Sequence, residues 1–381
     1  MEVFTSNNNV STYLAKILSC SDNDLCWCDS GLLFINCHKF LHTLKQTSIG
    51  KIGYLFYQLR KKKMCLHPEK ASCSKDIIDA HSIQNSKSLD SISENGLVYR
   101  FEINLKKIFN KGKNELFMPD KIGKSNTSVF RGFCGYHDNK LFKEIDNNNI
   151  DPTQEQSVLL SIRSIAWEIY AKKTTSDFAD IKKELGMGAN SLKQAEIQVT
   201  LNYLKDGATI GLNDLWYHYL NFFRIYYTND YSRLNRLVIK INENPEVLCS
   251  TSFFPEYDME GNFLQDINTD DILELITFEV LSNGKHGIIQ FCWYDNFISC
   301  KKFADSLCNS CNLQNAILKM LFYLSENHAF NITWFNNLSV IKKKSIMELA
   351  MSIENNNNIY ILTLDKKKYI NWTIKEIIKE Y

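Results

Sequence analysis

The sequence lacks an excess of charge of either sign, because 44 Lys and Arg residues are nearly balanced by 43 Asp and Glu residues over 381 residues. A formal charge of +1 excludes a global attraction to nucleic acid or to a membrane surface, so any such attraction must be local. Long apolar runs are also lacking, since charges such as Arg163, Arg224 and Lys319 interrupt the most apolar stretches. The first ten residues carry no basic residue and no apolar run. We therefore expect a cytoplasmic protein that neither is secreted nor spans a membrane.

Several common catalytic motifs are missing as well. The sequence contains no G-x-x-x-x-G-K-[ST] motif, no strand-associated G-x-G-x-x-G motif and no G-x-S-x-G motif. These absences leave nucleotide hydrolysis, Rossmann-type cofactor binding and α/β-hydrolase chemistry without support. Cys308 and Cys311 form one isolated C-x-x-C pair, which is a weak indication of zinc because helix faces supply such spacings freely.

Apolar residues make up 44% of the chain, enough for a sizeable core, and the length indicates two or three domains. Apolar periodicity predicts helices over residues 153–170, 191–204, 212–227 and 303–324. Runs of Ile, Val and Phe predict strands at 237–241, 276–281, 288–293 and 359–364, with a hairpin turn at 282–284. The predicted fold class is therefore α+β and multidomain, with N-terminal zinc-binding modules, a central helical region and a C-terminal α/β region. The predicted boundaries are residues 1–44, 45–150, 151–235 and 236–381, with a linker around Asp151 and Pro152.

Twelve cysteines in a chain expected to be cytoplasmic are not a disulfide framework, because the cytosol is reducing. Their spacing instead suggests metal sites. Cys26 and Cys28 can chelate a metal from a tight turn, which Gly31 permits, and the adjacent Cys37 and His38 can complete a tetrahedral set suited to zinc. The alternative is that Cys26 and Cys28 are merely small buried hydrophobic residues.

This string resembles the SEC-C zinc motif, named after the C-terminal tail of the bacterial preprotein translocase motor. The motif C-x-C-x-S-G-x-x-aromatic-x-x-C-[CH] is matched by Cys26, Cys28, Ser30, Gly31, Phe34, Cys37 and His38. The departures are Trp27 for the usual Pro, Asp29 for Gly, and Leu32 and Leu33 for a Lys pair. They leave the ligands intact but weaken any partner contact that those lysines would make. A closed four-ligand site implies a structural zinc without chemistry of its own.

A second set of residues resembles a treble-clef zinc finger and, with catalytic additions, the HNH (ββα-metal) nucleases. The parts are Cys65 and Cys73, then His81, and later Cys134 and His137 followed by Asp138. The resemblance implies a second structural zinc held by Cys65, Cys73, Cys134 and His137. It implies His81 as the general base and Asp138 as a ligand of a catalytic Mg²⁺ or Mn²⁺ ion. A neutral imidazole can deprotonate water near pH 7, and carboxylate oxygens favour these hard cations.

This second set also departs from the nuclease pattern, and several alternatives stay open. Ala80 stands where many HNH nucleases have a metal-binding Asp or His, and the middle Asn of the motif could be Asn95 or Asn126. His67 could replace one of the four zinc ligands. His81 could be a zinc ligand in place of His137, or only a nearby polar residue. The finger would then be a treble clef without catalytic activity.

Basic residues are concentrated in one part of the chain. Residues 45–131 contain 17 Lys and Arg against 8 Asp and Glu, a net charge of +9 in a chain that is neutral overall. Phosphate contacts by such residues give affinity that falls with salt. The candidate nucleic-acid contacts are Arg60, Lys61, Lys62, Lys63, Lys111 and Lys113. The alternative, which Lys61 to Lys63 taken alone would favour, is a solvated surface.

Together these features predict a divalent-metal-dependent HNH-like nuclease acting on DNA or RNA, with two structural zinc ions. The alternative is a non-catalytic zinc-binding module that contacts nucleic acid or a protein. The enzyme is favoured only slightly, because Ala80 counts against it and Asp138 counts for it. The whole chain also resembles bacterial accessory proteins that carry an N-terminal SEC-C motif, which implies a role in anti-phage defence. The C-terminal half is expected to sense a target or to bind a protein partner.

Overall fold

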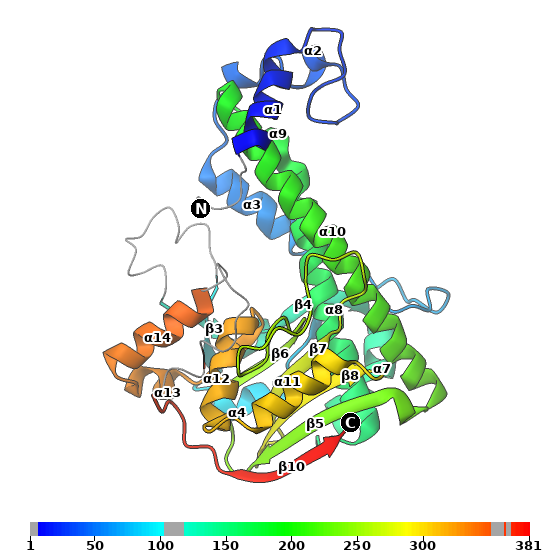
Figure 1. Ribbon diagram of the computed structural model, residues 1–381, viewed down its shortest axis with the longest axis vertical. Coiled ribbons are helices and arrows are strands. Elements are labelled where there is room, and N and C mark those ends of the chain that lie inside the picture. Colours follow the sequence, from blue (N-terminus) through cyan, green and yellow to red (C-terminus); the bar gives the residue numbers. More distant parts are fainter. Residues whose placement is uncertain (1–6, 103–117, 352–361, 363–366) are drawn as a thin grey trace. The chain divides into compact units, whose positions relative to one another are not determined.

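A computed structural model describes residues 7–102, 118–351, 362 and 367–381 (Figure 1). The described residues form two compact units. Unit 1 contains residues 7–62 and 171–213, and unit 2 contains residues 63–102, 118–170 and 214 onwards. The mixture of helices with antiparallel sheets confirms the predicted α+β class. The predicted domain boundaries stay a prediction.

Unit 1 is helical. It contains α1 (Asn7–Ser19), α2 (Phe34–Cys37), α3 (Ile49–Leu59), α9 (Lys182–Gly186) and parts of two long helices, α8 (Gln154–Phe178) and α10 (Ser191–Thr228). Ser48 caps α3 by accepting a hydrogen bond from the backbone N–H of Lys51. We predicted two helices where the single helix α10 runs. The glycines at 207 and 211 lower helix propensity, but glycine lacks the ring that breaks a helix at proline.

Unit 2 is built on an eight-stranded sheet with the order β10-β5-β8-β7-β6-β9-β2-β3, and every pairing in it is antiparallel. The strands are β2 (Leu97–Arg100), β3 (Asp120–Gly123), β5 (Leu234–Ile241), β6 (Val247–Phe253), β7 (Ile276–Ser282), β8 (Gly287–Tyr294), β9 (His328–Phe330) and β10 (Ile374–Glu380). The strands predicted at 237–241, 276–281 and 288–293 are confirmed. The turn predicted between β7 and β8 contains Gly284, whose φ of 90° favours glycine.

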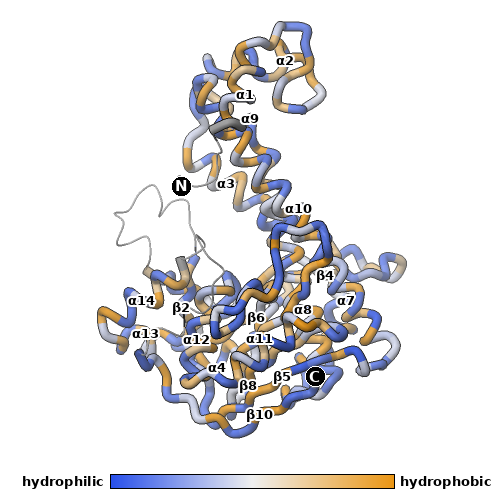
Figure 2. Tube along the Cα trace, in the orientation of Figure 1, coloured by the Kyte–Doolittle hydropathy of each residue, from blue (hydrophilic) through white to orange (hydrophobic). Residues whose placement is uncertain are grey.

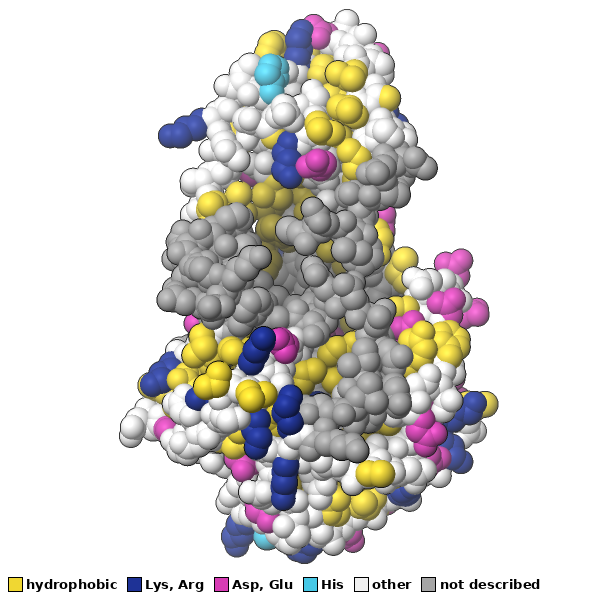
Figure 3. Space-filling view, turned by 60° about the vertical axis from the view of Figure 1, so that its left-hand side comes forward, with side chains coloured by type: hydrophobic (Ala, Val, Ile, Leu, Met, Phe, Trp, Pro, Cys, Tyr) yellow, Lys and Arg dark blue, Asp and Glu magenta, His cyan; other side chains and the backbone are white. Residues whose placement is uncertain are grey.

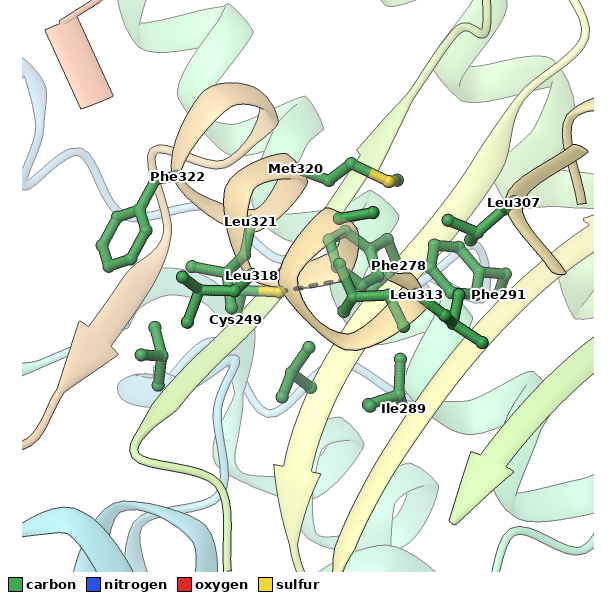
Figure 4. Close-up of a cluster of buried hydrophobic side chains, with 14 of the residues drawn as sticks. Cys249, Phe278, Ile289, Phe291, Leu307, Leu313, Leu318, Met320, Leu321 and Phe322 are labelled. Atoms are coloured by element: carbon green, nitrogen blue, oxygen red, sulfur yellow. Dashed lines mark hydrogen bonds between the residues drawn. The ribbon is translucent and has the colours of Figure 1, made fainter. Parts of the chain in front are cut away.

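Both faces of the central strands are buried. On one face, alternate residues such as Phe278, Ile289 and Phe291 pack against α11 (Ile298–Cys308) and α12 (Leu313–Leu324) in the main core (Figure 4). The opposite face meets α8 through hydrogen bonds, one of which joins Ser161 to Thr277 over 2.8 Å. Both faces are therefore buried, but the face toward α8 carries polar side chains, including Thr277, Glu279 and Gln290, while apolar residues fill the other face. The tube coloured by hydropathy accordingly changes between orange and blue within unit 2 (Figure 2).

The C-terminal part differs from the sequence prediction in its helices. The helix predicted over 303–324 is wrong as a single element, because the turn-forming residues Asn309, Ser310 and Asn312 separate α11 from α12. The strand predicted at 359–364 lies outside the described residues except for Leu362. Short elements α4 (Asp90–Ile92), α13 (Ile332–Asn337) and α14 (Val340–Met351) complete the described part of unit 2. No helix within the described ranges has an apolar stretch long enough to cross a lipid bilayer.

A smaller two-stranded sheet in unit 2 carries the second metal-site candidate. β1 (Ile77–His81) pairs antiparallel with β4 (Val129–Cys134), so that Ile77 faces Cys134 and His81 faces Val129. Helix α7 (Gly135–Asn147) begins directly after β4. The chain therefore forms a β–β–α arrangement in which the first strand ends at His81 and the helix begins beside Cys134 and His137.

Candidate metal centres

The first cluster brings together the donor atoms of Cys26, Cys28, Cys37 and His38 in unit 1. All four atoms lie within 4.8 Å of one another. The sulfur atoms of Cys28 and Cys37 are 3.6 Å apart, and Nδ1 of His38 is 3.3 Å from the sulfur of Cys26. Tetrahedral zinc with ordinary bond lengths places two sulfurs about 3.8 Å apart and a sulfur and a nitrogen about 3.6 Å apart. The four residues predicted from the sequence could therefore bind zinc.

Local backbone geometry explains how this short segment gathers four ligands. The backbone N–H of Cys26 donates to the carbonyl of Leu32 over 2.7 Å, which closes the turn. Asp29 and Gly31 both have positive φ, at 60° and 73°. Such angles cost little at glycine and are tolerated by Asp, so these two residues allow the chain to reverse. Helix α2 then delivers Cys37 and His38 to the open side of the turn.

Groups around the first cluster support its ligands. The Ser30 hydroxyl lies 3.4 Å from the sulfur of Cys37, and the Trp27 ring packs on His38 with centroids 4.5 Å apart. Burial alone would raise the pKa of Cys28, but hydrogen bonds with His38 and Ser30 outweigh it and lower that pKa to about 6. Burial instead raises the pKa of Cys26 and Cys37, so of the three thiols only Cys28 is shifted toward the thiolate, the form that binds zinc.

The second cluster brings together Cys65, Cys73, Cys134 and His137 in unit 2, again with donor atoms within 4.8 Å. Nδ1 of His137 lies 3.3 Å from the sulfurs of both Cys65 and Cys134. The other ring nitrogen of His137 lies 3.0 Å from the Ser72 hydroxyl. Such a hydrogen bond orients a ligating imidazole. These four residues could likewise bind zinc, and His81 does not take part in the cluster.

His67 lies against this cluster and contacts His137, Glu69 and Tyr227. Its ring stacks on His137 with centroids 3.8 Å apart and an interplanar angle of 8°. Nδ1 accepts a hydrogen bond from the backbone N–H of Glu69, and Nε2 faces the hydroxyl of Tyr227 at 3.4 Å. Burial and the neighbouring His137 lower the pKa of His67 to about 4, so the ring is neutral near pH 7. His67, Glu69 and His137 also form a further group of possible metal donors within 4.8 Å of one another, so the alternative that His67 replaces one of the four ligands stays open.

His81 stands at the end of β1 with one nitrogen buried and unpaired. Nε2 has no hydrogen-bond partner within the described part of the chain. Burial lowers the pKa of His81, and an interaction with the backbone of Ser125 partly opposes this shift. The lowered pKa favours the neutral ring, which is the form that a general base requires.

The groups near His81 come from three elements. Arg163 of α8 and Asp146 of α7 both influence its pKa, as does Asp79 of β1. Burial raises the pKa of Asp138, and the charges of the same Arg163 and Asp146 also influence it. His81 and Asp138 therefore share one charged neighbourhood, although neither belongs to a cluster of three or more closely spaced metal donors among the described residues.

The structure separates the two Asn residues that the sequence left open. Asn126 is next to Ser125, whose backbone contacts His81. Asn95 instead occupies the turn between Glu94 and Leu97 with φ of 52°. Of the two, only Asn126 belongs to the short 3-10 helix, residues 124–126, that adjoins the His81 ring.

The basic segment is divided between the units. Arg60, Lys61 and Lys62 belong to unit 1 and Lys63 to unit 2, and the predicted contacts Lys111 and Lys113 lie outside the described residues. Lys62 pairs with Asp177 at 2.7 Å. The described basic residues therefore do not all lie on one module, and whether they contact nucleic acid stays a prediction.

Sequence reasoning missed two polar features. One is Ser72, which contacts the candidate ligand His137, and the other is the Arg163–Asp146 pair, which influences the pKa of His81. Ser72 stands directly before Cys73, and a hydroxyl next to a candidate ligand was the available signal. No comparable signal links Asp146 with Arg163, because they meet only through the packing of α7 on α8. Comparisons with models of protein families, with curated proteins and with solved structures found no match to this chain.

Proposed function

We propose that the β–β–α part of unit 2 is a zinc-supported, divalent-metal-dependent nuclease resembling the HNH class. The observation that carries the proposal is the position of His81. It ends the strand that pairs with β4, and its Nε2 has no partner among the described residues. A zinc ion in the second cluster would fix the start of α7, and with it Asp138, relative to the paired strands. These features support the proposal of a structural zinc beside a histidine base.

In this proposal each residue has one task. The imidazole of His81 takes the proton of the attacking water through Nε2, the ring nitrogen without a hydrogen-bond partner among the described residues. Asp138 would hold the Mg²⁺ or Mn²⁺ ion, which when bound supplies charge stabilisation at the phosphate and the leaving oxygen. Because Nε2 is buried, substrate binding must open the contacts around it.

Cleavage assays test the proposal directly. Purified protein is incubated with plasmid DNA, single-stranded DNA and RNA, with Mg²⁺, with Mn²⁺ or with EDTA. The resemblance to bacterial defence proteins makes phage nucleic acid a further substrate to include. Cleavage that requires the divalent ion and falls on the order of 100-fold in His81→Ala, with zinc content unchanged, supports the proposal. His286→Ala is the matched control, because His286 is a partly exposed histidine in the hairpin between β7 and β8.

A second candidate function is a binding module without catalysis. The observation that favours it is that, among the described residues, His81 and Asp138 do not join a third set of closely spaced metal donors. Leu25 (70% exposed) and Phe40 (55% exposed) are apolar side chains in the sequence around the first cluster, and they would then suit a protein partner. Figure 3 shows hydrophobic side chains on the molecular surface. Wild-type protein that binds nucleic acid or a protein but cuts nothing with either metal would support this candidate.

A further inference from the structure

Arg163, which is buried, and Asp146, which is 38% exposed, form an ion pair whose two charges both influence the pKa of His81. Nη1 of Arg163 donates to Oδ1 of Asp146 over 2.9 Å, and Nη2 donates to Oδ2 over 2.7 Å. The guanidinium also lies over the ring of Phe142, 4.1 Å from its centroid. The side chain of Arg163 is only 4% exposed. Two parallel hydrogen bonds and a stacked ring fix the guanidinium in one place and join α8 to α7.

The segment after His81 is tied to the same two helices. The side-chain amide of Gln84 donates to the carbonyls of Ile145 and Asp146 on α7, over 3.0 and 3.1 Å. Ser82 connects to α8 through Ser250, with hydroxyl distances of 2.6 Å from Ser82 to Ser250 and 2.7 Å from Ser250 to Ser164. The end of β1 is therefore held on both sides by the helices that the Arg163–Asp146 pair joins.

Two buried nitrogens in this neighbourhood have no partner among the described residues. One is Nε2 of His81, and the other is Nε of Arg163, an N–H donor. Buried polar atoms are nearly always hydrogen-bonded in folded proteins, and the exceptions concentrate where function requires them. Nη1 and Nη2 of Arg163, by contrast, each donate a hydrogen bond to Asp146. The Arg163–Asp146 pair thus joins α7 to α8 and also leaves Nε of Arg163 without a hydrogen-bond partner among the described residues.

We propose that the Arg163–Asp146 pair holds the His81 ring in position. The pair locks α7 to α8, and these helices in turn hold the end of β1 and the imidazole in one orientation. This inference rests on the proposed function for its catalytic meaning, but the placement of the ring can be measured without any cleavage. The positive charge of Arg163 also opposes protonation of His81, while Asp146 and Asp79 favour it. Arg163 acts through His81 and does not itself contact substrate.

The test removes both charges together, because a single substitution would leave an unpaired buried charge and could unfold the protein. The full-length chain carrying Asp146→Leu and Arg163→Met is compared with wild type and with Arg163→Lys. Zinc content, circular dichroism and the NMR signal of the His81 ring in histidine-labelled protein are measured for each, with His81→Ala assigning the signal. The matched control is Arg236→Met with Glu380→Leu, which removes another doubly bonded Arg–carboxylate pair in unit 2.

We expect the double variant to stay folded with its zinc, while the His81 signal broadens or shifts its titration. Cleavage should fall on the order of 10- to 100-fold, mostly in kcat, because misplacing a catalytic group has effects of that size. Arg163→Lys should recover only part of the activity, since lysine cannot make the two parallel bonds. The control pair should leave the His81 signal unchanged.

Two results would overturn the inference. One is a folded double variant whose His81 signal and titration match those of wild type. The other is an equal change of the His81 signal in the control pair, which would make the effect a general loss of packing. If wild-type protein cuts no substrate, the nuclease proposal fails, and the NMR comparison still decides whether the pair positions His81.

Discussion

The hydroxyl of Ser164 on α8 donates a hydrogen bond of 2.5 Å to the carboxylate of Glu279 on β7. This bond belongs to a buried polar chain between the helix and the sheet. Gln290 donates to the other carboxylate oxygen over 2.9 Å, and Ser250 and Ser82 extend the chain from Ser164 towards β1. A carboxylate that is 1% exposed between a helix and a sheet is costly to ionise, even with such donors.

The first prediction follows from Glu279. Burial raises its pKa to about 7, although Ser164 and Gln290 oppose the shift. An unfolded Glu titrates near pH 4.5. Between these values the folded state keeps a proton that the unfolded state releases, so this group lowers stability as pH rises through that window, by about 3 kcal/mol in total. Glu279→Gln should remove that contribution. Urea unfolding at pH 5, 6, 7 and 8 measures it as the difference between variant and wild type, and a difference independent of pH would contradict the assignment.

The second prediction concerns zinc content. The protein should contain about two zinc ions per chain, because each cluster offers four closely spaced donors. Cys37→Ser should lose one ion and Cys134→Ser the other, each with the loss of local structure. Elemental analysis by mass spectrometry checks the count, and Cys311→Ser is the control because this exposed cysteine lies outside both clusters. Retention of both ions in Cys134→Ser would rule out the second site.

The third prediction tests how His137 is oriented. Ser72→Ala removes the hydroxyl 3.0 Å from the second ring nitrogen of His137, so the affinity of that site for zinc should fall about 10- to 100-fold. Competition with a chromogenic chelator measures the affinity, and the first cluster should be unaffected. Ser93→Ala is a suitable control, because its hydroxyl bonds only the nearby carbonyl of Asp90. Equal affinities in both variants would show that Ser72 does not orient the ligand.

The fourth prediction concerns nucleic-acid binding by the basic segment. Reversing the charges of Lys61, Lys62 and Lys63 together with Lys111 and Lys113 should weaken binding and flatten its dependence on salt, because fewer counterions are released. Fluorescence anisotropy at several salt concentrations measures both effects. A control for the run Lys61 to Lys63 reverses the three consecutive lysines Lys342, Lys343 and Lys344 of α14. Unchanged binding in the first variant would make the basic segment a solvated surface.

The sequence by itself determined the features that depend on residues close to one another along the chain. The ligands of the first cluster span only residues 26–38, and the turn that gathers them depends on local residues such as Asp29 and Gly31. The apolar composition of β5, β7 and β8 likewise predicted strands, because each strand carries its own pattern. For the second cluster, whose Cys65 and Cys134 are far apart in the chain, only the resemblance to a treble clef implied the four donors, and it left His67 and His81 open as alternatives.

Only the tertiary structure decided the relationships between distant segments. The Arg163–Asp146 pair, the Glu279 chain and the stacking of His67 on His137 each depend on how helices pack against strands. Strand β10 was missed because its two Lys-Glu pairs resemble an exposed segment, yet it pairs with β5 at the edge of the sheet. Local patterns encode turns and periodicity, but which polar side chains meet in the interior is set by long-range packing that no short window of sequence contains.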